Sequence, residues 1–467
     1  MSQKPAIPKG TRDFSPREMV KRKHIIRVIE KKFQRYGYAP IETPSFENRS
    51  TLMGKYGEAG DRLIFKILDS GDFLKQADKD AWAQGNSNAF ANSIAGKALR
   101  YDLTVPLARY VVQHQSEIGF PFKRYQIQAV WRADRPQKGR FREFYQCDAD
   151  VVGSDSLWQE VELVQLYDDV FNALHLPVCI RVNNRRLLAG LAEVAGISEQ
   201  FVHLTAALDK WDKTGCENAV AEMGRRGIPQ SAIDTLATFF QLDTASNWER
   251  IHFLEAALKS SETGQKGIGE LRFILEKIQH YGLKIAELDL DPTLARGLDY
   301  YTGTIFEVVG KGIALGSLGG GGRYDELTGI FGLSDRPGVG ISFGLDRIYL
   351  ALEEKGLFPD LTGDKLQLLF IHFGAVEAAY SYRLVAALRN RGINCELYPE
   401  AAKLKKQLAY AHKNQVPYVA LAGSQEVASQ TVTLKNMRTG QQQTLTQDNF
   451  LSGLKDLLAD THSRPKL

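Results

Sequence analysis

The sequence predicts an α/β (α+β) protein in which an antiparallel sheet domain is interrupted by helices and followed by a smaller α/β module. Residues 122–153 alternate apolar and polar side chains with a period of two, which is typical of strands with one packed face. Residues 187–281 carry apolar side chains at helical spacing. Residues 366–436 alternate strand-like and helix-like segments, which predicts a compact α/β module of about 100 residues.

Composition limits the class of protein. A chain of 467 residues has room for about two to four domains, and 43% hydrophobic with 24% charged residues is typical of a soluble globular protein. Because the formal charge is only +4, any nucleic-acid-binding surface must be local. The four cysteines show no CxxC spacing, so we expect no metal site or disulfide framework and a reducing compartment. No signal-peptide core or bilayer-spanning run is present, so we expect a cytoplasmic protein that does not bind membranes.

Residues 1–186 are expected to form the first part of the sheet domain. Ser15 and Glu18 match a capping box, and Pro16 occupies the first helical position between them. The expected elements are a helix over 16–36, an extended edge segment over 38–44, a strand over 65–68, a loop-like polar tract over 70–98, an ordered segment over 99–110, two strands within 122–153, a helix over 157–174 and a strand over 178–182.

Three further regions complete the expected organisation. Residues 187–285 form a helical insertion, residues 286–356 return to the sheet domain, and residues 365–467 form the C-terminal module. Within 286–356 we expect sheet over 288–309, its end marked by the glycine-rich 316–322, and a strand over 338–342 that enters a helix over 343–354. In the module we expect strands over 366–373, 393–399, 417–423 and 431–436 and helices over 376–391 and 404–414.

The loop between the two strands of 122–153 is strongly basic. Residues 132–142 set a single acidic residue, Asp134, against Arg132, Arg135, Lys138, Arg140 and Arg142. This density suits a polyphosphate or a nucleic acid. The polar face of the strands collects Arg132, Gln146 and Asp150, although alternation alone would equally fit an ordinary solvated sheet face.

Two other stretches have unusual composition. Residues 296–303, RGLDYYTG, place consecutive tyrosines on a strand between glycines, which predicts a narrow aromatic slot with hydroxyl donors; the alternative is a hairpin core. Residues 338–347, GVGISFGLDR, place glycines at a strand-to-helix turn, where a ligand could approach the backbone closely. Arg347 then falls in the first turns of the helix. Taken alone, an arginine at that position would more often be an ordinary surface residue.

Together these stretches closely resemble the signature motifs of class II aminoacyl-tRNA synthetases, specifically the histidyl-tRNA synthetase family. The hairpin resembles motif 2, residues 338–347 resemble motif 3, and the first helix with residues 39–47 resembles the dimer-forming motif 1. RGLDYYTG is similar to the stretch particular to the histidine family and is the most specific match. The resemblance covers essentially the whole chain, and the C-terminal module resembles the anticodon-binding domain.

The resemblance implies a role for each matching residue. Arg132 would contact the reacting carboxylate and the α-phosphate, and Arg296 would also lie at the α-phosphate. Arg140 and Arg347 would hold the outer phosphates, and Phe144 would stack on adenine. The implied histidine-binding set is Asp102, Thr104, Arg132, Gln146, Asp150, Arg296, Tyr300 and Tyr301. The segment 99–110 resembles the eukaryote-like version of the family, with Asp102 where the common bacterial version carries glutamate.

The implied reaction joins L-histidine to tRNA(His), with ATP as a substrate, Mg²⁺ as a cofactor and a homodimer as the assembly. Physical chemistry supports these residue types, because a carboxylate that attacks a polyphosphate needs positive charge fixed in place beforehand. Arginine's planar fork suits phosphate and carboxylate. No side chain is required as a nucleophile, since the substrate carboxylate and later a ribose hydroxyl of tRNA serve.

Two alternatives remain for the whole chain. One is a regulatory paralogue, such as the synthetase-like subunit of ATP phosphoribosyltransferase, but such proteins lack an anticodon module. The other is a class II synthetase for another small amino acid, which RGLDYYTG argues against. In the C-terminal module, a solvated face competes with tRNA contact as the explanation of a basic set, namely Lys403, Lys405, Lys406, His412, Lys413, Lys435 and Arg438.

Overall fold

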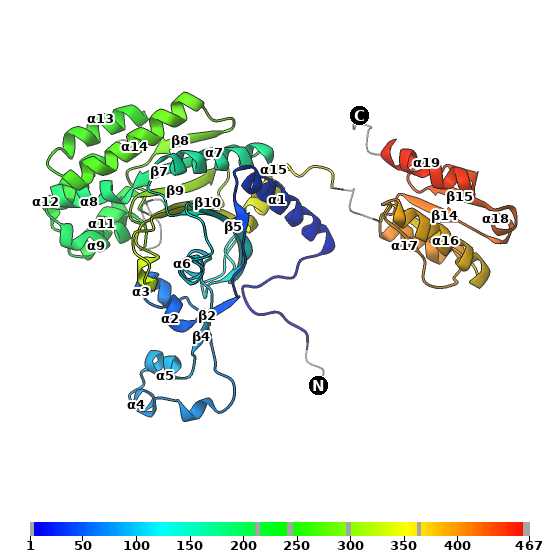
Figure 1. The fold of residues 1–467 in the computed structure, drawn as a ribbon, viewed down its shortest axis with the longest axis horizontal. Helices are drawn as coiled ribbons and strands as arrows, with labels where there is room; N and C mark the ends of the chain where they lie inside the picture. The colour runs from blue at the N-terminus through cyan, green and yellow to red at the C-terminus, as the bar shows by residue number, and fades with distance from the viewer. Residues whose placement is uncertain are drawn as a thin grey trace. The chain divides into compact units, whose positions relative to one another are not determined.

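The computed structural model describes residues 4–209, 211, 215–240, 246–295, 300–361 and 366–460. The chain divides into two compact units, Met1–Phe358 and Pro359–Leu467 (Figure 1). The predicted fold class is confirmed, since the first unit is built on a largely antiparallel sheet and the second is a separate α/β module. The described helices include none long and apolar enough to cross a membrane.

The first unit is organised around an eight-stranded sheet. Its strands, in spatial order, are β1 (Ala39–Pro40), β5 (Phe122–Trp131), β6 (Glu143–Val152), β11 (Gly338–Gly344), β10 (Gly319–Tyr324), β9 (Thr304–Gly310), β7 (Val178–Asn184) and β8 (Ala286–Leu290). All neighbours are antiparallel except the two outer pairs, β1 with β5 and β7 with β8. The predicted hairpin is β5 and β6, and its register pairs Gln128 with Gln146.

Helices cover one face of this sheet. They are α1 (Pro16–Arg35), α7 (Trp158–Ala173), α14 (Glu262–Tyr281) and α15 (Leu345–Lys355). The capping box of α1 is present, with Ser15 Oγ accepting from the Glu18 backbone N–H. Ile29 of α1, Phe171 of α7 and Ala149 of β6 are fully buried in the same core. The odd-numbered residues of β6 therefore face the helices, because alternate residues of a strand point to opposite faces.

A second, smaller core lies on the opposite side of the sheet, below it in Figure 1. Its elements are α6 (Thr104–Gln113), α2 (Arg49–Leu52), α3 (Gly57–Asp61) and a three-stranded sheet of β2 (Phe46–Asn48), β4 (Lys97–Leu99) and β3 (Lys66–Ile67). Val105 of α6 and Tyr324 of β10 are both buried in this core. It places the start of α6 beside the polar face of β6.

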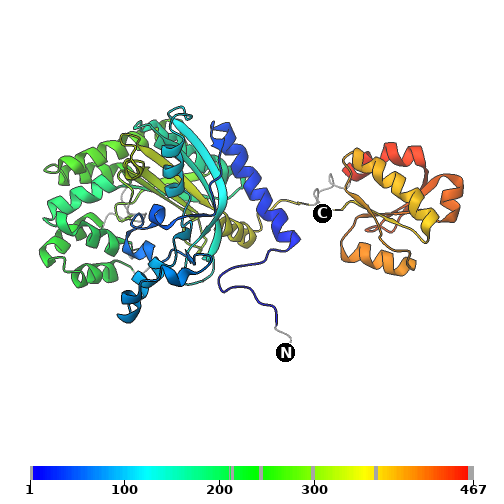
Figure 2. The ribbon, with the colours of Figure 1, turned by 60° about the horizontal axis from the view of Figure 1, so that its bottom comes forward.

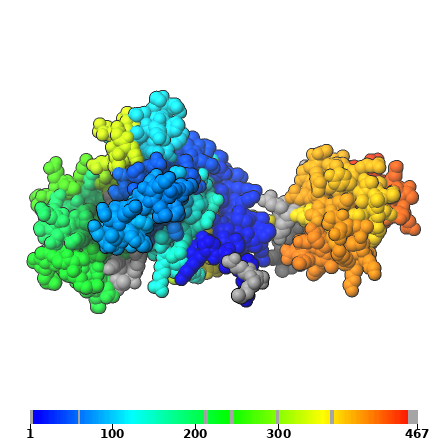
Figure 3. Space-filling model, turned by 90° about the horizontal axis from the view of Figure 1, so that it is seen from below, coloured from blue at the N-terminus to red at the C-terminus, as the bar shows by residue number. Residues whose placement is uncertain are grey.

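The tract 70–98 was predicted to be loop-like, and the structure corrects this. It contains the 3-10 turn η1 (Phe73–Lys75) and the short helices α4 (Lys79–Ala83) and α5 (Ser87–Ser93) before β4 begins. Asp78 and Asn86, polar residues typical of turns, instead cap these helices by accepting from Ala81 N and Ala89 N. The space-filling view from below shows the tract on the face toward the viewer (Figure 3).

Residues 185–281 are largely helical, as the apolar spacing predicts. The helices are α8 (Arg185–Val194), η2 (Ser198–Gln200), α9 (Phe201–Leu208), α11 (Cys216–Arg225), α12 (Gln230–Phe240), α13 (Asn247–Ala257) and α14, drawn in green in Figure 2. Helices α8 and α14 approach closely at two glycines, since a Cβ on Gly190 would lie 2.5 Å from Gly264 Cα. The exact limits 187–285 remain a prediction.

Two sequence-based predictions near the sheet are wrong. Gly319–Tyr324 is an interior strand, β10, rather than the end of the sheet, and the short 3-10 turn η3 (Gly329–Phe331) follows it. Glycine is needed there because a Cβ on Gly321 would lie 2.1 Å from Gly340 O. Tyr300 and Tyr301 lie in a turn before β9 rather than on a strand.

The second unit is an α/β module with a five-stranded sheet. Its elements are β12 (Leu368–Ile371), α16 (Ala375–Asn390), β13 (Cys395–Leu397), α17 (Leu404–Lys413), β14 (Tyr418–Leu421), α18 (Ser424–Ser429), β15 (Thr431–Asn436), β16 (Gln442–Thr446) and α19 (Gln447–Asp460). The strand order is β13-β12-β14-β15-β16, parallel across the first three strands and antiparallel across the rest. Phe370, Leu388 and Phe450 are buried in the core of this unit.

Candidate active site

A cavity of about 850 Å³ lies over the polar face of the central sheet. Gln146, Asp148 and Asp150 of β6 form part of its lining, while the alternate residues of that strand pack under the helices. The 132–142 loop, β10, β11 and the first turns of α6 and α15 also contribute, as do Tyr300, Tyr301, β9 and residues 314–318. The alternation within 122–153 therefore separates a packed core from a cavity rather than from bulk solvent.

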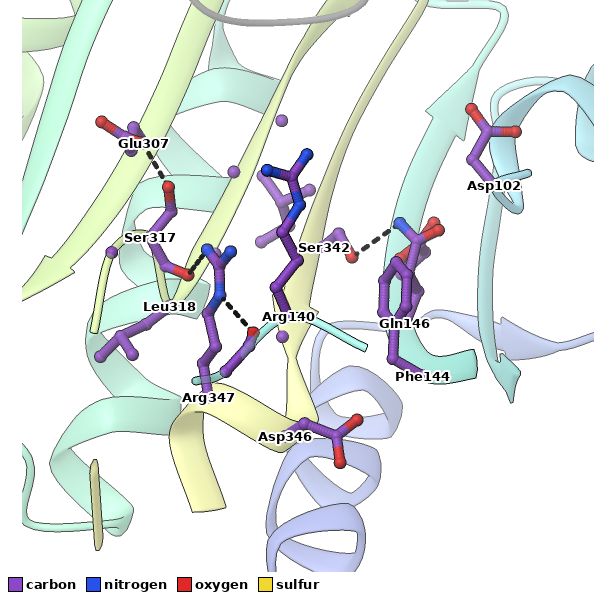
Figure 4. Close-up of a pocket in the computed structure, with 18 of the residues that line it drawn as sticks. Asp102, Arg140, Phe144, Gln146, Glu307, Ser317, Leu318, Ser342, Asp346 and Arg347 are labelled. Atoms are coloured by element: carbon purple, nitrogen blue, oxygen red, sulfur yellow. Dashed lines mark hydrogen bonds between the residues drawn. The ribbon is translucent and has the colours of Figure 1, made fainter. Parts of the chain in front are cut away.

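Arginines line one side of the cavity. Arg347 is held by two backbone carbonyls, donating from Nε to Gly139 O at 3.0 Å and from Nη1 to Ser317 O at 2.8 Å (Figure 4). Arg140 makes a two-point pair with Asp134, with donor–acceptor distances of 2.9 and 2.7 Å. Figure 4 shows Arg347 and Arg140 next to each other, with Gln146 and then Asp102 further to the right.

Arg132 lies between two aromatic rings. Its guanidinium carbon is 4.2 Å from the Tyr101 ring centroid and 5.2 Å from that of Phe144. Its Nε also donates to Tyr101 O at 3.0 Å. These contacts hold the planar group in one orientation at the cavity wall before any ligand arrives, since guanidinium groups stack on aromatic faces.

Asp102 and Thr104 lie where α6 begins, in the part of the cavity that carries carboxylates. Asp102 is buried and accepts hydrogen bonds from Tyr56 Oη at 2.8 Å, Tyr300 Oη at 3.0 Å and Val105 N at 3.1 Å. Burial raises the pKa of Asp102, although these hydrogen bonds and the charge of Arg132 oppose the rise. Thr104, at the first position of the helix, lines the same cavity.

Asp150 lies deep in the sheet beside a buried arginine. Its Oδ1 accepts from Tyr324 Oη at 2.6 Å, and its Oδ2 lies 2.9 Å from Nη2 of Arg124, a residue with no exposed surface. Burial raises the pKa of Asp150, and the Arg124 charge and the Tyr324 hydrogen bond oppose this. Asp150 Oδ1 is thus held by a hydrogen bond, while Oδ2 has only the ion pair with Arg124 and no hydrogen-bond partner within the described residues.

Asp148 is a carboxylate that the sequence analysis did not single out as a site residue. It lines the cavity, is 2% exposed, and its Oδ1 has no hydrogen-bond partner within the described residues. Gln146 Nε2 donates to Ser342 Oγ at 3.2 Å, and Ser342 bonds in turn to Asp148. Burial raises the pKa of Asp148 to about 7, against the opposing charge of Arg124.

Tyr300 and Tyr301 form an aromatic corner of the cavity. Their ring centroids are 4.9 Å apart with an edge-to-face arrangement. Burial raises the pKa of both hydroxyls above the usual tyrosine value, so both stay protonated near neutral pH and can donate hydrogen bonds. Gly322 lies against this corner, since a Cβ there would be 2.9 Å from the Tyr301 ring.

Two glycines of β11 leave room for side chains of the protein. A Cβ on Gly340 would lie 1.9 Å from Asp150 Oδ1, and a Cβ on Gly338 would lie 2.3 Å from the Tyr324 ring. Gly340 and Gly344 also line the cavity, so the expected approach of a ligand to this backbone stays a prediction.

The structure places ten of the eleven predicted site residues around this one cavity. They are Asp102, Thr104, Arg132, Arg140, Phe144, Gln146, Asp150, Tyr300, Tyr301 and Arg347. Arg296 lies outside the described residues. Sequence reasoning missed Asp148, Arg124, Ser342 and Tyr324, which belong to the neighbourhood of the site. The alternation of β5 and β6 already put Arg124 and Asp148 on the polar face and could have indicated them.

In the described ranges, no group of three or more His, Cys, Asp or Glu side chains could hold a metal ion. In the second unit, Lys403, Lys405, Lys406, His412 and Lys413 are all exposed on or beside α17.

Comparisons with known proteins agree with this geometry. A family model described as histidyl-tRNA synthetase matches residues 10–74 and 95–348, and one described as anticodon binding domain matches residues 367–457. A curated histidine–tRNA ligase of Christiangramia forsetii is 59% identical, covering 97% of this chain and 100% of its own length. That of Flavobacterium johnsoniae is 55% identical over 95% of this chain and 97% of its own length.

A solved structure gives the same result. The crystal structure of histidyl-tRNA synthetase from Nostoc sp. PCC 7120 matches with a TM-score of 0.78 and 28% identity, covering 98% of this chain and 100% of that one. The first family model leaves out residues 75–94, which hold α4 and α5. All the residues that line the cavity fall inside the matched ranges. The chain therefore belongs to the histidyl-tRNA synthetase family.

Proposed function

We propose that this chain activates L-histidine with ATP and then transfers histidine to the 3′ end of tRNA(His). One observation carries the proposal: a single cavity is lined by three arginines together with buried carboxylates and tyrosine side chains, namely Arg132, Arg140, Arg347, Asp102, Asp150, Tyr300 and Tyr301. This combination suits a substrate pair in which a polyphosphate meets a small amino acid that bears N–H donors. Family membership supports the same reaction.

In the first step, an oxygen of the histidine carboxylate attacks the α-phosphorus of ATP. The bond from that phosphorus to the bridging oxygen breaks, and pyrophosphate leaves with the electron pair. Arg132 and Arg296 are proposed to neutralise the two anions as they meet, and Arg140 and Arg347 to hold the outer phosphates. Phe144 is proposed to stack on adenine. Fixed guanidinium groups lower the barrier because they need no reorganisation during the reaction.

Recognition of histidine is proposed to depend on the carboxylate part of the cavity. Asp102, Thr104, Gln146, Asp150, Tyr300 and Tyr301 are the proposed contacts. Gln146 Oε1 has no hydrogen-bond partner in the described part of the chain, so an acceptor is available for a substrate N–H. A site of buried polar groups rejects analogues that lack the matching atoms by about 10⁴-fold or more.

In the second step, a ribose hydroxyl at the tRNA end attacks the carbonyl carbon of the adenylate. The carbon–oxygen bond to the phosphate breaks and AMP leaves. The exposed basic residues around α17 are proposed to contact tRNA phosphates, which would make tRNA binding salt-dependent. The match of this unit to an anticodon-binding domain supports that contact.

Mg²⁺ is proposed to accompany ATP. The ion usually takes one or two protein carboxylates together with phosphates and water, so a dedicated cluster of ligands is not needed. Glu307 lines the cavity near Ser317 and Arg347 and could supply such a carboxylate. When bound, the ion would neutralise phosphate charge. A cytoplasmic location is proposed as well, in keeping with membership of the histidyl-tRNA synthetase family.

Pyrophosphate exchange tests the proposal directly. We expect ATP–pyrophosphate exchange with histidine in the presence of Mg²⁺, and none above background with the other amino acids. Charging is expected with tRNA(His), and added salt should weaken charging more than exchange because only charging uses tRNA phosphates. Exchange with another amino acid would favour the rival synthetase, and no exchange with any amino acid would favour the regulatory paralogue.

We further propose that two chains form a homodimer through the α1 and 39–47 region. Strand β1 forms one edge of the central sheet, and Phe46 on β2 is 49% exposed. Unpaired strand edges and exposed aromatic side chains are common sites of association. Sedimentation equilibrium is expected to give the mass of two 52.2 kDa chains. A single-chain mass at micromolar concentration would contradict the proposal.

A further inference from the structure

The bend at Thr302 and Gly303 supports the aromatic corner from behind. Thr302 N donates to Arg323 O at 2.8 Å, at the end of β10. Gly303 O accepts from Arg185 N at 2.8 Å, at the start of α8. The two residues that follow Tyr300 and Tyr301 are therefore bonded both to the central sheet and to the helical segment.

Asp325 joins these two attachments through its side chain. Its Oδ2 accepts from Thr302 Oγ1 at 2.8 Å and from Arg186 Nη2 at 3.2 Å. Its backbone N–H donates back to Thr302 Oγ1 at 3.0 Å, so the threonine hydroxyl and the aspartate bond reciprocally. The Asp325 side chain is 25% exposed and that of Arg186 is 23% exposed, so these contacts are partly shielded from water.

Arg186 extends the network into the helices. It forms an ion pair with Glu270 of α14, and the other oxygen of Glu270 accepts from Asn184 Nδ2 at 2.7 Å. Asn184 in turn caps α8 by accepting from Arg186 N at 2.9 Å. The carboxylate of Asp325 thus lies between the helix pair α8–α14 and the bend behind the tyrosines.

The contacts of Asp325 and Thr302 reach only the part of the cavity that carries the tyrosines and carboxylates. Tyr300 donates to Asp102, and Tyr301 lies against Gly322, so a shift of the bend moves groups in the carboxylate part. The arginine side depends on other attachments, because Arg347 is held by Gly139 O and Ser317 O. A binding site loses affinity when its groups move by about 0.5 Å or more.

We propose that Asp325 is a positioning residue for the amino-acid pocket, which holds Tyr300 and Tyr301 in place through Thr302 and ties them to the helical segment through Arg186. The proposal rests on the function proposed above. Asp325 touches no substrate in this proposal; it acts through the bend.

The test uses the full-length protein in ATP–pyrophosphate exchange. Asp325→Ala and Thr302→Val are each expected to raise the KM for histidine about tenfold, while the KM for ATP stays within twofold of wild type. Thr302→Ser keeps the hydroxyl and is expected to behave like wild type. The double variant should be no worse than the more affected single variant, because both substitutions break one shared contact.

Glu255→Ala provides a matched control. Glu255 pairs with Arg272 at 2.5 Å between α13 and α14, a contact that does not reach the cavity. The Glu255→Ala substitution should leave the KM for histidine and the KM for ATP unchanged. Equal rises in the two KM values, or a Thr302→Ser variant as impaired as Thr302→Val, would overturn the positioning role. Wild-type protein without histidine-dependent exchange would instead overturn the proposed function, so the two failures are distinguishable.

Discussion

Arg132→Ala is expected to lower the kcat of histidine-dependent pyrophosphate exchange by a factor on the order of 10²–10³, the usual loss when one fixed electrostatic donor is removed. Arg132 is already oriented by Tyr101, through a stacking distance of 4.2 Å and a hydrogen bond of 3.0 Å. The guanidinium group is therefore already in place, and its charge can act on the transition state without any further ordering of the side chain. Arg132→Lys should recover only part of the activity, because an ammonium group cannot bind a carboxylate or phosphate through two parallel hydrogen bonds as a guanidinium group can.

Arg135→Ala is the control for this prediction. Arg135 lies in the same loop and carries the same charge, but it is exposed and is not part of the cavity lining. It should therefore keep a kcat close to that of wild type. The measurement is the exchange rate at saturating histidine and ATP. If the two substitutions cost the same, loop charge in general would explain the effect and the specific role of Arg132 would be wrong.

Asp148→Asn is expected to stabilise the first unit at pH 8. Burial raises the pKa of Asp148 to about 7 from an ordinary 3.8, so the folded protein binds a proton that the unfolded chain has released. Stability therefore falls as pH rises from about 4 to about 7, and the full cost of the buried charge is present above about 7. Asparagine removes this cost, which is on the order of a few kcal/mol.

Urea unfolding at several pH values measures this effect. The variant should have the higher midpoint at pH 8, and the difference should shrink as pH falls toward about 4, since the wild-type carboxyl is then neutral as well. Asp72→Asn, an exposed carboxylate with 57% of its side chain accessible, should show no such trend. A difference between Asp148→Asn and wild type that is independent of pH would contradict the assigned titration.

Local patterns in the sequence predicted most helices and strands, because helix capping and strand alternation depend on residues that are close together in the chain. The capping box at Ser15 and Glu18 appears as predicted, since it needs only residues within one helical turn. The β5–β6 hairpin appears because its alternation spans two long strands. The prediction for 70–98 failed because Asp78 and Asn86 serve turns and helix caps equally well.

The predictions for the glycine-rich strand and the tyrosines failed for a different reason. Gly321 is in a strand because the carbonyl of Gly340 lies against it, and that contact joins parts of the chain far apart in sequence. No local propensity favours a run of four glycines as an interior strand. Likewise, nothing near Tyr300 shows that Thr302 and Asp325 hold a bend before β9.

The amino-acid sequence was enough to predict the sheet-and-helix architecture, the family resemblance and the residue types of the arginine and histidine motifs, because periodicity and motif spacing are properties of short segments. The packed fold was needed to show that Asp148 faces the cavity with an oxygen that has no hydrogen-bond partner among the described residues, that Arg124 pairs with Asp150, and that Gly340 leaves room for that carboxylate. These facts depend on which strands become neighbours. That choice is made by burial of the whole core, and no single segment encodes it.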